Sequence, residues 1–170
     1  MDKVICNASP LIYLAKADAI TILKAVVGEV LIPSAVYDEV VVKGKELGQV
    51  DAFRVERAVK QGWIIVHKVA EMYAVEIPLH PGEVEVISLA KQIGVSTVLM
   101  DDLKARTACE LAGLEPIGTV GILLMALREN CFGFDGFLRT LQDIVRSGLY
   151  LKEDVYLAAV REAIRMTAGR

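Results

Sequence analysis

The sequence of 170 residues lacks the features that mark membrane and secreted proteins. No apolar run approaches the roughly 18–20 residues of a membrane span, so we expect no membrane partner. The N-terminus has no basic stretch followed by an apolar one, and we therefore expect a cytoplasmic protein. Cysteines are few, and Cys6, Cys109 and Cys131 have no CxxC spacing. They predict reduced thiols, mostly in the core, with a single disulfide as the minor alternative.

Three kinds of ligand-binding motif are also missing. The segment 7–10, Asn-Ala-Ser-Pro, is not a glycine-rich phosphate loop, which disfavours a nucleotide-binding module. His67 and His80 lack zinc-like spacing and are expected on the surface or in loops. A phospho-acceptor receiver domain needs paired acids after its first strand, and Asn7 stands there alone.

Charge of one sign does not dominate, because the formal net charge is only −3. Contact with a nucleic acid must therefore come from local basic patches rather than from the whole molecule. Taken alone, these patches are more typical of an ordinary solvated surface. They are Lys43 with Lys45, Arg54 with Arg57 and Lys60, and Lys104 with Arg106.

Short apolar segments alternate with longer amphipathic ones, which predicts an α/β fold with a parallel sheet. A hydrophobic content of 54% is consistent with strands buried on both faces. We expect strands at 3–6, 29–32, 63–66, 96–100 and 115–117. We expect a first helix with Ser9 as its N-cap. Further helices are expected at about 19–26, 34–43, 50–61, 83–93, 103–111, 119–130, 134–146 and 152–165, with a charged loop between Gly44 and Gly48. With no linker or repeat, the chain is predicted to be one domain, with a core of about 1–130 and a helical extension of about 131–170.

Four of these segments end with an oxygen-bearing side chain where a core residue or a plain surface residue would be expected. They are Asn7, Glu39, Glu83 and the pair Asp101–Asp102. Carboxylates are costly near a core unless they are paired or hold a metal ion. If the four segments converge, they build an acidic pocket for a hard cation.

Helical periodicity selects Glu83 over its neighbour Glu85. Glu83 lies three and four residues before Val86 and Ile87, at the N-terminal end of the apolar stripe of its helix. Glu85 projects to the opposite side with Ser88 and is expected to be solvated. The alternative for Glu83 is an acid in the first helical turn, stabilised by the helix dipole.

The same reasoning selects Glu39 over Asp38. The angular neighbours of Glu39 on an α-helix are Ala35, Val36 and Val42, all apolar. The alternative is a boundary residue whose carboxylate stays in water.

Asn7, Asp101 and Asp102 each follow a predicted strand and precede a helix. In open α/β sheets, ligands bind beyond the carboxyl ends of the strands. The alternative for Asn7 is turn formation, and Asp102 is the better candidate for a helix N-cap.

The four segments together resemble the sequence motifs of the PIN-domain family. Segment 3–9, a strand followed by Asn7 and Ser9, is similar to the opening motif of the family, and segment 32–40 is similar to its second motif, with Glu39 as the helical acid. Segment 82–90 resembles the third motif with Glu83 as the acid. Segment 98–102 resembles the fourth, in which Asp102 aligns best and Asp101 is a close second.

The resemblance, which covers about 3–130, implies a three-layer α/β/α fold and a Mg²⁺- or Mn²⁺-dependent nuclease that acts on RNA. By that resemblance, Glu83 and Asp102 hold the main metal ion, Asp101 is a second ligand, and Glu39 completes the catalytic cluster. Asn7 is a further metal ligand that, with Ser9, orients water or phosphate.

Lys104 and Arg106 are expected to bind the RNA backbone beside this pocket. Many small PIN proteins are toxins silenced by a partner peptide, so the resemblance also implies a possible antitoxin partner and a homodimer. One departure opens an alternative. Family members usually carry Asp at the first position, and Asn7 adds no negative charge. The chain would then be a catalytically weak or inactive PIN-like module that binds nucleic acid or protein.

Overall fold

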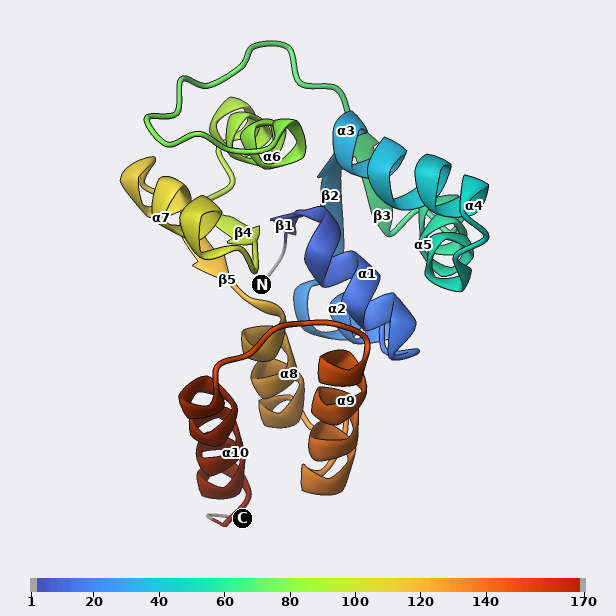
Figure 1. The fold of residues 1–170 in the computed structure, drawn as a ribbon, viewed down its shortest axis with the longest axis vertical. Helices are drawn as coiled ribbons and strands as arrows, with labels where there is room; N and C mark the ends of the chain where they lie inside the picture. The colour runs from blue at the N-terminus through green and yellow to red at the C-terminus, as the bar shows by residue number, and fades with distance from the viewer. Residues whose placement is uncertain (1–2, 169–170) are drawn as a thin grey trace.

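A computed structural model of the protein, which describes residues 3–168, has a five-stranded parallel sheet between two layers of helices (Figure 1). The predicted three-layer α/β/α fold is confirmed. The strands are β1 (Lys3–Cys6), β2 (Glu29–Pro33), β3 (Ile64–His67), β4 (Thr97–Leu99) and β5 (Glu115–Ile117), in the order β3-β2-β1-β4-β5. The helices are α1 (Ala8–Lys16), α2 (Thr21–Val27), α3 (Ser34–Tyr37), the π-helical η1 (Asp38–Lys43), α4 (Gly44–Glu46), α5 (Val50–Lys60), α6 (Pro81–Ile93), α7 (Leu103–Leu111), α8 (Thr119–Arg128), α9 (Phe134–Arg146) and α10 (Glu153–Ala168).

The central strand β1 is the innermost part of the core. Val4, Ile5 and Cys6 are fully buried, as expected for a parallel strand covered on both faces. Ile5 is the partner of Leu31 in β2 on one side and of Val98 in β4 on the other. The cysteines are free, and Cys6 and Cys109 are buried, which confirms the prediction of reduced core thiols for these two; Cys131 is exposed.

The direction of the chain reverses between β1 and β4. From β1 the chain moves outward to β2 and β3, and it then returns through α6 to β4 on the other side of β1. Figure 1 shows α6 and α7 on one face of the sheet and α1 and α5 on the other, as right-handed crossovers require. The carboxyl ends of β1 and β4 therefore flank the switch point at which α/β folds bind ligands.

The last three helices pack together beside the sheet (Figure 1). Helix α8 contacts α2, α9 and α10. Helix α9 buries Phe137, Leu141 and Ile144, which lie on one face at helical spacing. No helix in residues 3–168 is both long enough and apolar enough to cross a membrane.

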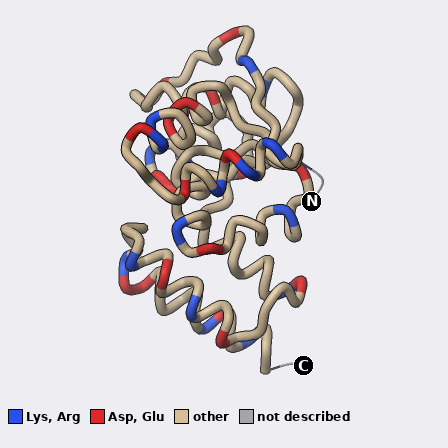
Figure 2. Tube along the Cα trace, turned by 90° about the vertical axis from the view of Figure 1, so that its right-hand side faces the viewer, with Lys and Arg blue, Asp and Glu red and all other residues tan. Residues whose placement is uncertain are grey.

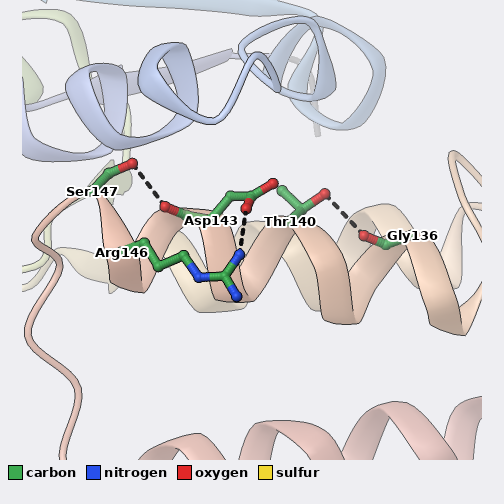
Figure 3. A network of polar contacts seen from close by, with 5 residues as sticks. All are labelled: Gly136, Thr140, Asp143, Arg146 and Ser147. Atoms are coloured by element: carbon green, nitrogen blue, oxygen red, sulfur yellow. Dashed lines mark hydrogen bonds and ion pairs between the residues drawn. The ribbon is translucent and has the colours of Figure 1, made fainter.

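Helix α9 ends in a turn fixed by short-range hydrogen bonds (Figure 3). The Ser147 hydroxyl donates to the Asp143 carbonyl at 2.7 Å, and Arg146 lies 3.4 Å from the Asp143 carboxylate. Gly148 then adopts a φ of 113°, a conformation that favours glycine. The chain turns here and crosses to α10, running past one end of α8 in Figure 1.

Two predicted helix boundaries are wrong. Ser9 is not the N-cap of the first helix, because α1 already begins at Ala8 and Asn7 occupies the N-cap position without a side-chain capping bond. Pro10 is compatible with this earlier start, since the first four N–H groups of a helix have no intrahelical partner. Gly44 does not open a loop, because it continues the helical segment to Glu46.

Gly44 is helical for a packing reason. A Cβ at this position would lie 2.8 Å from the Cβ of Ala52, so only glycine allows α4 to approach α5 this closely. The sequence alone presents Gly44 as a helix breaker, because the contact that favours it comes from another helix.

We expect Gly44→Ala to lower the free energy of unfolding by about 1 kcal/mol. Overpacking costs about 1–3 kcal/mol and outweighs the gain of about 0.5–1 kcal/mol in helix propensity. Urea denaturation measures the change. In an Ala52→Gly background the clash is absent, and the same substitution should stabilise the protein. Destabilisation of equal size in both backgrounds would contradict this explanation.

Candidate functional site

Asn7 connects the carboxyl ends of the two strands at the switch point. Its side chain is only 5% exposed. The backbone N–H donates to the Leu99 carbonyl at 3.0 Å, and Nδ2 contacts Sδ of Met100 at 3.1 Å. These contacts leave the amide oxygen Oδ1 facing the start of α6, where a Cβ on Gly82 would lie 3.9 Å from it.

Glu39, which lies in η1, also approaches Gly82 at the start of α6. A Cβ on Gly82 would lie 3.6 Å from Oε2 of Glu39. Glu39 belongs to the π-helical segment η1, whose wider turn shifts the side-chain phase relative to an α-helix. Val42, predicted on the same apolar arc as Glu39, is therefore 42% exposed. Glu39 is itself exposed, as the alternative of a boundary residue expects, and the predicted apolar arc is wrong because the residue period is not that of an α-helix here.

Gly82 is the residue that sequence reasoning missed. It is buried in the first turn of α6, between the end of β1 and η1. The missing side chain leaves a space faced by the oxygens of Asn7 and Glu39. The available signal was a glycine directly before an acid in the first turn of a helix.

Glu83 follows Gly82 and is 7% exposed. Its Oε2 accepts the backbone N–H of His80 at 3.0 Å, a capping interaction at the start of α6. Burial, with a smaller contribution from the Glu83 charge, raises the pKa of Cys109 on α7 to about 11, while Arg106 opposes the shift. Glu83 therefore caps its own helix, and its charge adds to the rise in the pKa of Cys109 on α7.

Asp101 and Asp102 have different environments. Asp102 is exposed and is the N-cap of α7, where Oδ1 accepts the Ala105 N–H at 3.0 Å. Asp101 is half-buried and accepts two bonds of 2.7 Å from Thr119, one from the backbone N–H and one from the hydroxyl. Thr119 was not singled out from the sequence, because its role depends on the start of α8 lying beside the end of β4.

The pKa of Asp101 is shifted, and its charge contributes to the pKa shifts of two neighbouring side chains. Burial raises its pKa, and the Thr119 hydrogen bonds and the nearby Arg106 guanidinium oppose that rise. Burial raises the pKa of Cys6 and of Tyr13, and the Asp101 charge adds to both shifts. The charge of Asp101 therefore acts on the end of β1 and on α1.

A cleft of about 870 Å³ opens on the Asp101 side of the site. Of the predicted residues, Ser9, Asp101, Asp102 and Arg106 line it, and Lys104 lies exposed on α7 outside its wall. Arg106 donates to the Met100 carbonyl at 3.2 Å. The remaining walls come from α1, α7, β5 and the residue that follows it, α8, the connection between α9 and α10, and the start of α10. Their residues are Tyr13, Leu103, Pro116, Ile117, Gly118, Val120, Gly121, Gly148, Leu149, Tyr150, Leu151, Lys152 and Val155.

The predicted oxygen donors therefore form two groups at one edge of the sheet. The oxygens of Asn7 and Glu39 face Gly82, which Glu83 follows in the chain, and Asp101 and Asp102 lie at the cleft. Within the described residues, no three Asp, Glu, His or Cys side chains are placed to hold one ion together. Mg²⁺ needs fewer, because it is usually held by one or two carboxylates with waters and substrate phosphates. Glu39 with the Asn7 carbonyl oxygen fits that requirement.

The prediction that Glu85 and Ser88 face solvent is wrong. Glu85 accepts the Ala35 N–H at 3.1 Å and so caps α3. Ser88 is buried, because the connection between β3 and α6 covers it, and its hydroxyl accepts the Tyr73 N–H at 2.9 Å. A helix face shows which side chains point away from the sheet, but not whether a connecting segment covers them.

Two of the three basic residues on α5, Arg54 and Lys60, are paired with acids, and the third, Arg57, is exposed. Glu56 lies 2.8 Å from Lys45 and 3.2 Å from Lys60, and hydrogen bonds to these two lysines lower its pKa. Arg54 pairs with Asp18 at 3.3 Å. Figure 2 shows acidic and basic residues interspersed along the chain. The ordinary-surface interpretation therefore fits α5, whereas Arg106 lies at the cleft.

A known family matches almost the whole chain. The family model DUF3368, described as a PIN domain, matches residues 3–165. No curated protein and no solved structure matches the chain.

We expect Asp101→Asn to stabilise the metal-free protein at pH 7. Burial raises the pKa of Asp101 in the folded state, so its favourable contribution is complete at low pH and is lost as the pH rises through the unfolded-state and then the folded-state value. Asn keeps an acceptor for the Thr119 N–H and carries no charge. Urea denaturation in EDTA should give the variant a higher free energy of unfolding than wild type at pH 7. The difference in this free energy should become smaller toward pH 3. A difference that does not change with pH would contradict the assignment.

Proposed function

The chain belongs to the PIN-domain family, whose members are generally nucleases, and from that premise we propose that it is a metal-dependent endoribonuclease. The reaction is hydrolysis of a phosphodiester bond in RNA. One observation carries the proposal: oxygens of Asn7 and Glu39 face one space over Gly82, beside Glu83, at the switch point of the sheet.

Mg²⁺ or Mn²⁺ would be held by Glu39, Glu83 and the Asn7 carbonyl oxygen, with Asp101 and Asp102 at the neighbouring strand end. When bound, the ion supplies an activated water and neutralises charge on the leaving oxygen. The donor set supports this assignment, since hard cations prefer oxygen ligands and PIN nucleases typically use divalent metals.

Other side chains position the substrate. The two Thr119 bonds fix the orientation of the Asp101 carboxylate, so it needs no reorganisation when substrate binds. Ser9 presents its hydroxyl to the cleft, where it can orient water or phosphate. Arg106 at the cleft and Lys104 on the outer surface of α7 would contact the RNA backbone.

A second candidate rests on Asn7. The residue brings no negative charge, and its amide nitrogen is engaged by Met100. The missing charge favours a catalytically weak or inactive PIN-like binding module, whereas the Met100 contact leaves the amide oxygen facing the site. Titration with Mn²⁺ separates the two candidates, because absence of binding and of cleavage would favour the inactive module.

A toxin role is a further proposal that follows from the family resemblance. In that role, an antitoxin peptide or a second copy of the chain would cover exposed apolar side chains. The most exposed group on α4 and α5 consists of Leu47, Val50 and Phe53. Loss of RNA cleavage on adding a co-encoded peptide would support this role.

We expect Glu83→Gln to reduce Mn²⁺-dependent cleavage of single-stranded RNA by on the order of a hundredfold or more, because a ligand charge is lost. The amide oxygen can still accept the His80 N–H, so the variant should fold. Glu85→Gln is the matched control, since it removes a charge from the same helix outside the site. Equal activity of wild type and the Glu83 variant would refute the assignment.

We also expect Gly82→Ala to weaken Mn²⁺ binding by about tenfold or more, because the methyl group enters the space faced by Glu39 and Asn7. The added Cβ makes only ordinary contacts and alanine is the better helix former, so the substitution should not destabilise the protein. Electron paramagnetic resonance of free Mn²⁺ measures binding without activity. Gly133→Ala, where a Cβ meets nothing, is the control. Unchanged Mn²⁺ affinity in the Gly82 variant would place the ion elsewhere.

A further inference from the structure

Tyr150 lies in the connection between α9 and α10, at the wall of the cleft that contains Asp101. Its side chain is 82% exposed, the highest value among the large hydrophobic residues of the described chain. A ring left this open beside a candidate active site is available to a ligand.

The connection that carries Tyr150 is held on both sides. The Tyr13 hydroxyl donates to the Gly148 carbonyl at 3.3 Å, which ties the connection to α1. Leu149 is buried, and its N–H donates to the Ile144 carbonyl at 3.3 Å. The turn at Ser147 in Figure 3 fixes where this connection leaves α9. Leu149 is therefore held inward, whereas its neighbour Tyr150 faces solvent.

The surroundings of Tyr150 combine aromatic and cationic groups. Tyr13 and Tyr150 line the cleft together with Arg106 and Lys152. Proteins that bind single-stranded nucleic acid use this combination, in which bases stack on aromatic rings and cations follow the backbone. Asp101 and Asp102 line the same cleft, so a strand that binds here passes the acids that follow β4, the strand paired with β1 next to the proposed metal site.

We propose that Tyr150 forms a stacking subsite for the base of a nucleotide next to the scissile phosphate of single-stranded RNA. Arg106 and Lys152 would contact the backbone on either side of this base. The proposal rests on the proposed function and specifies its substrate as single-stranded, because only an unpaired base exposes its face to a side chain. Since every base has a π-face, this subsite tolerates any base.

Tyr13 has a different role in the same cleft. Its hydroxyl is engaged by Gly148, and its ring is half-buried, so it forms part of the wall and supports the connection. Substitution of Tyr13 is therefore expected to affect the position of Tyr150, whereas substitution of Tyr150 removes the stacking face itself.

The test measures binding separately from cleavage. Fluorescence anisotropy in EDTA follows binding of a labelled single-stranded oligoribonucleotide to wild type, Tyr150→Leu and Tyr150→Phe. We expect Tyr150→Leu to weaken binding by about tenfold, because base–aromatic stacking is lost. Tyr150→Phe keeps the ring and should bind like wild type. Tyr73→Ala removes an exposed aromatic ring in the connection between β3 and α6, away from the cleft wall, and should also bind like wild type.

A second oligoribonucleotide series identifies the base involved. One abasic position is moved along the strand, and a single position should weaken wild-type binding without weakening binding to Tyr150→Leu further. Equal affinity of wild type and Tyr150→Leu, with cleavage intact, would overturn the subsite and leave the nuclease proposal standing. Loss of binding in Tyr150→Leu without any cleavage by wild type would support the subsite and contradict the nuclease proposal. Sedimentation also tests whether Tyr150→Leu converts a dimer to a monomer without changing RNA affinity. That result would mean that the ring contacts a second copy of the chain, and it would overturn the proposal.

Discussion

The parallel pairing of β1 with β4 is the constraint on which the rest of the structure depends. It places the ends of two strands that are more than ninety residues apart in the sequence side by side, and the bond from the Asn7 N–H to the Leu99 carbonyl extends the pairing to the site itself. Asn7 and Asp101 therefore occupy one edge of the sheet, at its switch point. Breaking this pairing would separate the two groups of oxygen donors.

Two local features then bring side chains from the helices to this edge. Gly82 leaves a space at the start of α6 that the Asn7 and Glu39 oxygens face, and the π-helical segment places Glu39 beside this space. Neither feature benefits the core, because a glycine in a helix and a wider helical turn both cost stability relative to a regular α-helix. Irregular backbone at the place where oxygens converge is consistent with a binding role.

The sequence predicted the α/β fold, most element bounds and the faces of regular helices, because these depend on local periodicity. It selected Glu83 by that periodicity, and the structure buries Glu83 at the start of α6. It could not reveal features that depend on contacts distant in sequence. The phase of η1, the packing reason for Gly44, the burial of Ser88, the partnership of Thr119 with Asp101 and the position of Tyr150 all come from segments that meet only after folding.

A crystal soaked with Mn²⁺ tests most directly whether the oxygens around Gly82 form the proposed divalent-cation site. Anomalous scattering locates the ion without reference to activity. We expect Mn²⁺ within about 2.1 Å of oxygens of Glu39 and Asn7, with Glu83 beside the ion and water molecules completing its coordination. Mn²⁺ bound at another part of the chain, with these oxygens unliganded at saturating metal, would contradict it.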